Sequence, residues 1–245
     1  MGRQSRRACH RKSGGMAERR PPVPVHGREA HWLGAMPVTA AKVLRRASTV
    51  RGYQAGDLVF SPSPDPAHIY VLEDGLVRLF RLTRAGEEFT LRYIRPGELF
   101  GEMSVVSGRP RQGFAQARIA SKILRIPRAA FVATLRTHNS LLYSVTKKIA
   151  GRVIDYQSRA EDLIFLDARR RLARFLLRVA TKHGQPDGKG LTLALPLTHA
   201  EIASGIGTSR QTVSRFLREL SNAGLVTRSG VQLVLPDPAR LEAID

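Results

Sequence analysis

Six side chains between residues 208 and 215 have the types and spacing of a surface that reads DNA. They are Thr208, Ser209, Arg210, Gln211, Ser214 and Arg215. In a helix that begins near residue 208, the long side chains face outward from the N-terminal half. Recognition helices place that end in the major groove, where an arginine bonded to guanine is the commonest specific contact. We therefore predict that this segment binds double-stranded DNA.

A second stretch, residues 97–117, has groups suited to holding a phosphate and a sugar. A short helix at about Glu102 to Val106, bracketed by glycines, would offer free backbone N–H groups at its start. Arg109 and Arg111 follow within reach of the same space, and Glu102 could accept a hydrogen bond from a sugar hydroxyl. The alternative is a salt bridge between Glu102 and Arg111 that closes an unliganded pocket.

The elements that must position the first group read as a helix-turn-helix at residues 197–217. Thr198 with Glu201 has the spacing of a capping box, and Thr208 with Gln211 repeats it ten residues later. Between them, Gly207 permits the positive φ of a tight turn. Small Ala203 lets the helices cross closely, and apolar residues form their shared contact: Ile202, Ile206, Val213 and Phe216. The alternative is a surface hairpin whose charges are merely solvated.

The second group falls in a segment of short strands separated by glycine turns, from Tyr53 to about Ile126. The strands expected there are 58–60, 68–72, 76–82 and 89–94, and the turns are at 73–75, 84–86 and 95–97. Strands this closely spaced, without intervening helices, predict an antiparallel sandwich or barrel.

One long helix is expected over residues 139–165. Apolar residues recur there at spacings of three and four, a narrow row that we call the long-helix seam: Leu142, Val145, Ile149, Val153, Tyr156, Ala160 and Leu163. A narrow seam is typical of a two-stranded coiled coil between identical chains. The alternative is that the helix simply lies on its own β domain.

The rest of the C-terminal part predicts a winged helix. Asp167 can cap a further helix with an apolar face, followed by a polar loop at 184–190 and a strand at 191–195. After the recognition helix, residues 222–224 form a plausible C-cap. Residues 226–235, folded about Ser229 and Gly230, then form a β-hairpin wing.

Composition narrows the classes of protein. The net charge of +20 favours a polyanionic partner, but half of it falls in residues 1–51, which carry 12 Lys and Arg against two acids. We expect residues 1–50 to be a disordered basic tail, with a DNA-gripping arm as the functional alternative. A lone cysteine, Cys9, excludes internal disulfides, a cysteine-based zinc site and a four-cysteine iron–sulfur cluster.

Other functions have little support in the sequence. No apolar run approaches the ~20 residues of a membrane helix, and the N-terminus lacks the apolar core of a signal peptide, which favours a cytoplasmic protein. No nucleophile elbow, phosphate-loop lysine motif or zinc-spaced His/Cys set occurs. We therefore expect neither an enzyme nor a metal site.

The order of these parts resembles the CRP/FNR family of bacterial transcription regulators, over about residues 52–241. The most specific matches are Phe165-Leu-Asp167, Pro186-Asp-Gly188 and the run 208–215. The resemblance implies an α+β fold: a tail (1–50), an effector-binding-like β-roll (51–137), a dimerisation helix (138–166) and a winged-helix DNA-binding domain (167–245). It also implies a homodimer on a two-fold symmetric operator, and an RNA polymerase contact at residues 184–190.

The resemblance also bears on the effector. In members that bind cyclic AMP, Gly-Glu is followed by Pro-Arg-Ser/Thr-Ala, and a long-helix threonine contacts adenine. The matching pocket residues here are Gly101, Glu102, Arg111, Gln112 and Tyr156. Gln112 replaces the phosphate-facing hydroxyl and Tyr156 the threonine, so we expect weak or no dependence on cyclic AMP.

Four alternatives remain open beside that expectation. Within the family they are a cyclic-AMP-dependent regulator and one that binds a dicarboxylate such as 2-oxoglutarate at Arg111. Outside it they are an architectural DNA-binding protein without a signal response and a cyclic-nucleotide module that partners an enzyme. The helix-turn-helix argues against the last of these.

Overall fold

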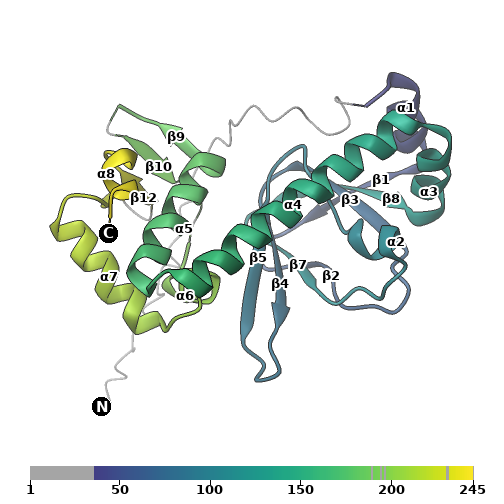
Figure 1. The fold of residues 1–245 in the computed structure, drawn as a ribbon. Coiled ribbons are helices and arrows are strands. Elements are labelled where there is room, and N and C mark those ends of the chain that lie inside the picture. Colours follow the sequence, from purple (N-terminus) through teal and green to yellow (C-terminus); the bar gives the residue numbers. More distant parts are fainter. Residues whose placement is uncertain (1–35, 189, 194, 196, 230–231, 245) are drawn as a thin grey trace, which may run out of the picture.

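The computed structural model describes residues 36–188, 190–193, 195, 197–229 and 232–244. An N-terminal β domain and a C-terminal domain lie at opposite ends of one long helix (Figure 1). The predicted α+β class, with an antiparallel β domain, a long helix and a winged helix-turn-helix, is confirmed. Among the described residues, no helix has the length and apolar character needed to cross a membrane.

Two four-stranded antiparallel sheets make up the β domain. The first has the order β1-β8-β3-β6 and the second β2-β7-β4-β5. The strands are β1 (Thr49–Tyr53), β2 (Leu58–Phe60), β3 (His68–Asp74), β4 (Val77–Leu82), β5 (Glu88–Ile94), β6 (Leu99–Phe100), β7 (Phe114–Ala117) and β8 (Ser121–Pro127). All four predicted strands are present, and Gly75, Gly86 and Gly97 adopt the positive φ that their turns need. The five-residue helix α2 (Met103–Ser107) lies between β6 and β7.

Residues 36–50, which we expected to belong to a disordered tail, are ordered. Helix α1 (Val38–Ala47) buries Ala40 and Leu44 against α3 (Arg128–Thr137), and β1 follows it directly. An amphipathic helix of ten residues gains its stability from such packing rather than from its own sequence. The rest of the predicted tail, residues 1–35 with Cys9, lies outside the described residues.

The long helix α4 spans Asn139–Phe165, the range that its periodicity predicts. Its first turns pack on the β domain, where Leu141 and Val145 are buried and Ile149 joins the same apolar cluster. Val145 therefore does not belong to an outward seam, because 2% of its surface is exposed. Further along, Val153 and Leu163 remain about half exposed, at 49% and 51%.

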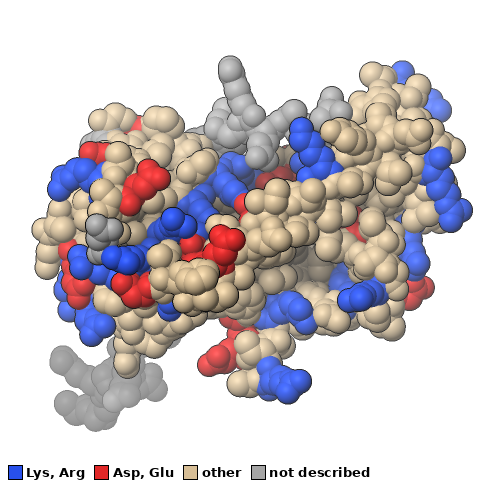
Figure 2. Space-filling view, in the orientation of Figure 1, with Lys and Arg blue, Asp and Glu red and all other residues tan. Residues whose placement is uncertain are grey.

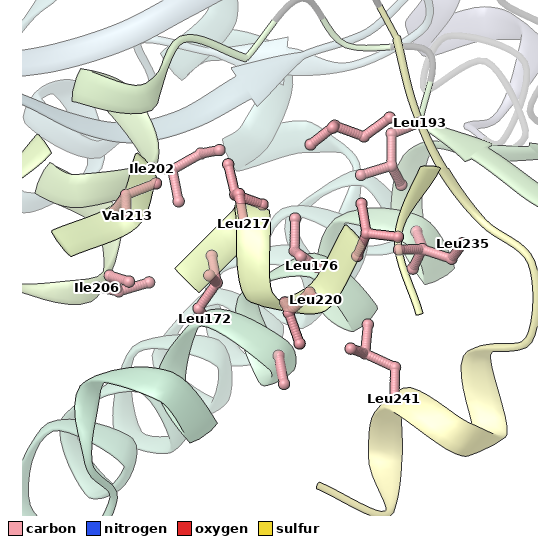
Figure 3. Packing of buried hydrophobic residues seen from close by; sticks show 14 of the residues in the cluster. Leu172, Leu176, Leu193, Ile202, Ile206, Val213, Leu217, Leu220, Leu235 and Leu241 are labelled. Atoms are coloured by element: carbon pink, nitrogen blue, oxygen red, sulfur yellow. The ribbon is translucent and has the colours of Figure 1, made fainter. Parts of the chain in front are cut away.

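The C-terminal domain surrounds one apolar core (Figure 3). Its elements are α5 (Ala168–His183), β9 (Gly184–Pro186), β10 (Leu191–Leu193), α6 (His199–Ile206), α7 (Arg210–Asn222), β11 (Thr227–Ser229), β12 (Gln232–Leu235) and α8 (Pro238–Glu242). Leu172, Leu176, Ile202, Val213 and Leu220 meet at its centre, from α5, α6 and α7. Strands β11 and β12 form the predicted wing, whose turn residues Gly230 and Val231 lie outside the described residues.

We predicted a polar loop over residues 184–190, but its first three residues are a strand instead. Residues 184–186 form β9, which pairs antiparallel with β10 and extends the wing sheet to the order β11-β12-β10-β9. Gly184 permits this immediate change from helix to strand, because a Cβ there would lie 2.3 Å from the Ala180 carbonyl oxygen.

Candidate nucleic-acid interface and effector pocket

The first helix of the helix-turn-helix begins as predicted. Thr198 Oγ1 accepts from the Glu201 N–H, and the Glu201 carboxylate accepts from the Thr198 N–H, which completes a capping box. Gly207 ends α6 at φ 63°, and the Thr208 N–H then donates to the Ala203 carbonyl at 3.0 Å. This tight turn fixes the direction in which α7 leaves.

The predicted second capping box, Thr208 with Gln211, is wrong by one residue. The N-cap of α7 is Ser209, whose Oγ accepts from the Thr212 N–H at 3.1 Å. Both Thr208 and Ser209 carry a hydroxyl, so the sequence offers two adjacent starts. The shift leaves Arg210 as the first residue of the helix and turns Gln211 toward solvent.

The outward face of α7 brings together most of the predicted recognition residues. Arg210, Gln211, Ser214 and Arg215 line a shallow surface hollow, and Arg218 joins them. In Figure 2, Lys and Arg side chains lie on this end of the molecule, interspersed with Asp and Glu. Arg218 was not among the predicted residues, although its i+4 spacing from Ser214 puts it on the same face.

Two further residues tie α7 to α6 and to the wing. His199 Nδ1 lies 2.7 Å from Ser214 Oγ, and Arg228 Nη2 lies 2.9 Å from His199 Nε2. Burial, together with the charges of Arg228 and Arg210, lowers the pKa of His199. A neutral His199 can accept from Arg228 at Nε2 and donate to Ser214 at Nδ1, so this chain orients both side chains.

The predicted effector residues are only partly assembled. The Glu102 carboxylate, 1% exposed, forms an ion pair with Arg152 of α4 rather than with Arg111. Arg111 Nη2 instead donates to the carbonyls of His68 and Gly101, at 2.8 and 2.9 Å. The expected closing salt bridge between Glu102 and Arg111 is therefore wrong, because each has a different partner.

The Arg111 guanidinium is held on the inner side of the β domain. It stacks on the Phe60 ring, 4.1 Å from the centroid, and burial lowers its pKa. Gly101 has φ +80°, and a Cβ there would lie 3.2 Å from Arg111 Nη2, so glycine permits this close approach. Arg109, by contrast, is exposed.

Several of these side chains already have partners inside the protein. Arg111 Nη2 is bonded to two backbone carbonyls, and Gln112 is exposed and accepts from Arg81 at 2.7 Å. One atom of the group lacks a partner: the buried acceptor Glu102 Oε2 has no hydrogen bond among the described residues. Tyr156 is 44% exposed and lines a different cavity, between the domains.

A buried ion cluster joins the helix-turn-helix to the β domain. Glu201 of α6 contacts Arg78 of β4 at 3.0 Å and Arg118 after β7 at 3.4 Å. Burial opposes ionisation of Glu201, but hydrogen bonds from Thr198 and the charge of Arg118 outweigh it and lower its pKa. Glu201 therefore has two structural roles, as capping residue of α6 and as domain contact.

Two family models match the chain. The Crp-like helix-turn-helix domain matches residues 170–244, and the cyclic nucleotide-binding domain matches residues 50–138. The two matches leave the region of α4 between them.

Curated relatives match most of the chain. The Cyclic AMP receptor protein of Thermus thermophilus is 32% identical over 194 residues, covering 79% of this chain and 87% of that protein. The Global nitrogen regulator of Synechocystis sp. is 28% identical over 194 residues, covering 78% and 86%.

Solved structures share the fold. A CooA mutant from Carboxydothermus hydrogenoformans aligns with a TM-score of 0.68 at 26% identity, covering 80% of this chain and 87% of that one. FixK2 from Bradyrhizobium japonicum aligns with a TM-score of 0.71 at 24% identity, covering 81% and 97%.

Proposed function

Because this chain belongs to the CRP/FNR family of transcription regulators and has their DNA-binding helix-turn-helix, we propose that it acts as a homodimer on an inverted-repeat operator. The observation that carries the proposal is the apolar stripe left exposed along α4. Large apolar side chains normally become buried, and a contiguous row of them marks an interaction surface.

The stripe follows the predicted long-helix seam without Val145. Leu142 is 47% exposed, Val153 49% and Leu163 51%, and Tyr156 and Ala160 lie between the last two along the seam. Ile149 bridges this stripe and the core beneath it. The second copy of α4 is the partner that fits, since a two-stranded coiled coil buries one such narrow stripe from each helix.

On DNA, we propose that Arg210 and Arg215 read base edges, assisted by Gln211 and Ser214. Thr208 and Ser209, at the start of α7, contact phosphate instead. Arg218 extends this surface along the groove. Both arginines are exposed to solvent, and the ion pair of Arg215 with Glu219, at 3.9 Å, lies on the same exposed helix surface.

We further propose that operator binding requires no cyclic AMP. The Glu102 carboxylate forms an ion pair with Arg152, and Arg111 donates hydrogen bonds to two backbone carbonyls. The pocket is in this way stabilised by internal contacts. We also propose that the protein activates transcription rather than represses it. The exposed end of the β9–β10 hairpin, at Pro186 and Gly188, would contact RNA polymerase.

An operator series tests the proposal. Two recognition helices related by a two-fold axis reach successive major grooves, so the best half-sites are inverted and centred ~10–10.5 base pairs apart. Binding to selected DNA should fall when ~5 base pairs are inserted between the half-sites and stay weak when ~10 are inserted, because a full extra turn restores the helical face but doubles the separation that one dimer spans. Equal binding to single half-sites would contradict the homodimer.

A further inference from the structure

A second cavity, of about 340 Å³, lies between the two domains. Strand β5 and the segment after it form one wall, α4 crosses it, and α5 with the start of the helix-turn-helix forms the other wall. In Figure 2, Lys and Arg side chains lie along the boundary between the two halves of the molecule. Of the predicted pocket residues only Tyr156 lines this cavity; Gly101, Glu102, Arg111 and Gln112 do not.

The cavity wall carries a large excess of positive charge. Seven Lys and Arg line it, against three acidic residues, Glu98, Asp155 and Glu201. Each of the three acids already has an ion-pair partner. Glu98 contacts Arg92 at 3.1 Å, Asp155 contacts Lys182, and Glu201 contacts Arg78 and Arg118. Two of the cations, Arg152 and Arg178, pair with Glu102 and Asp162, which lie outside the cavity lining. Among the described residues, the cations of the wall without a carboxylate partner are Arg95, Lys148 and Arg159.

Several donors of the wall are left without an acceptor. Within the described residues, the Arg95 and Lys148 side chains form no hydrogen bond or ion pair. The buried Nε atoms of Arg92 and Arg95 and the Nδ1 atom of His183 also have no partner there. Buried polar atoms normally do have partners, so each unpartnered atom marks a place for a ligand or water.

Mutual repulsion accompanies this arrangement. Burial, followed by the charges of Arg95, Lys182 and Arg92, lowers the pKa of His183 to about 3. Burial and the neighbouring Arg92 likewise lower the pKa of Arg152 to about 10. A negative charge placed among these groups would relieve both effects.

The wall also has apolar residues: Phe175, Val179, Leu195 and Leu197. A volume of about 340 Å³ falls at the lower end of the range of small-molecule sites. The cavity thus combines cationic groups with apolar surface that a small organic group could contact.

We propose that this interdomain cavity binds a small phosphorylated organic compound. Its phosphate contacts Arg95, His183 and Lys148, and its carbon framework contacts Phe175 and Val179. Because β5 and α4 supply one side and α5 the other, the bound anion joins the two domains and fixes the helix-turn-helix relative to the β domain. The inference goes beyond the proposed function, since its test needs no DNA.

Calorimetry with phenyl phosphate, inorganic phosphate and phenol tests the two ends separately. Phenyl phosphate should bind at least about tenfold more tightly than inorganic phosphate, because ~1.4 kcal/mol from burying its ring is a factor of ten. Phenol should not bind measurably. Equal affinity for phenyl phosphate and inorganic phosphate would overturn the organic part of the proposal.

Variants locate the site. Arg95→Gln and Lys148→Gln remove cations that hold no ion pair, so each variant should fold and bind phenyl phosphate about tenfold more weakly. Matched controls are Arg84→Gln and Lys147→Gln, both exposed and outside the cavity, and Arg210→Ala on the DNA face. All three controls should bind as the parent does.

If Arg210→Ala abolished binding while Arg95→Gln left it intact, the phosphate would bind at the DNA face and the cavity proposal would be wrong. The same result would leave the homodimer on its operator untouched. Unchanged affinity in both Arg95→Gln and Lys148→Gln would also overturn the cavity site.

Discussion

Arg210 and Arg215 project from the first two turns of α7, and both are exposed to solvent. Replacing either with alanine should cost about 1–3 kcal/mol of operator binding and relax the preference at one base position per half-site. Ser209→Ala should instead weaken all sequences alike, since it removes both the N-cap of α7 and the proposed phosphate contact. Binding to base-substituted operators measures the difference. An Arg210→Ala protein with the parent's ratio of specific to nonspecific binding would contradict the assignment.

The lowered pKa of His183 predicts that the fold loses stability as the pH falls. Burial and three neighbouring cations, Arg95, Lys182 and Arg92, lower its folded pKa to about 3, whereas an unperturbed histidine titrates near 6.5. Between these values the unfolded state binds more protons, so the free energy of unfolding falls as the pH drops from ~6.5 toward ~3. The slope from this group is at most ~1.4 kcal/mol per pH unit.

Urea unfolding of His183→Gln at pH 7, 6 and 5 checks this. Its free energy of unfolding should fall less steeply with acid than that of the parent, although the carboxylates Glu201 and Asp167 contribute acid sensitivity to both proteins. Parallel curves for the two proteins would assign the sensitivity elsewhere.

At the scale of elements, the exposed stripe of α4 makes a prediction about assembly. Val153→Asp should yield monomers, because a carboxylate within a coiled-coil interface loses hydration without gaining a partner. Lys147→Asp, exposed and off the stripe, is the matched control and should stay dimeric. Ile149→Asp is a poorer test, since Ile149 also packs against the β-domain core. A Val153→Asp protein that sediments as a dimer would place the interface elsewhere.

The β9–β10 hairpin carries the proposed contact with RNA polymerase. Pro186→Ala alters its exposed surface, whereas an Asp187 variant would also break the bond that Asp187 accepts from Thr192. We expect Pro186→Ala to reduce transcription with operator affinity unchanged. Ser221→Ala, exposed in the same domain, is the control. Equal transcription by all three proteins at saturating operator occupancy would make the hairpin a connector only.

Local patterns in the sequence predicted most elements, but not all of them. The strands between glycine turns, the range of α4 and the first capping box follow from signals within a few residues. Helix α1 was missed because its apolar residues, Ala40 and Leu44, are buried only by packing against α3, which lies about 90 residues later in the chain. The start of α7 was misplaced because Thr208 and Ser209 offer equivalent hydroxyls.

At the scale of the whole molecule, the contacts between the two domains could not be predicted from local sequence patterns. Glu201 reads locally as a capping residue, and its pairing with Arg78, 123 residues away, emerges only once α6 lies against β5. The same holds for Arg152, which reaches across 50 residues to Glu102. The predicted pair of Glu102 with Arg111 was therefore wrong, and the effector pocket itself stays a prediction.

The Glu102–Arg152 pair and the backbone contacts of Arg111 also decide what the whole molecule needs from a ligand. In the function that we propose, these internal partners replace the contacts that an effector's sugar and phosphate would otherwise make with Glu102 and Arg111. The central claim is that this regulator is DNA-competent without cyclic AMP.

Fluorescence anisotropy with the purified full chain and its selected operator tests that claim directly. Without nucleotide, the protein should bind the operator and discriminate against scrambled DNA. Adding cyclic AMP to about 100 μM should change operator affinity by less than about twofold, which is a coupling free energy of ~0.4 kcal/mol. A tenfold or larger gain in operator affinity at low-micromolar cyclic AMP would contradict the account.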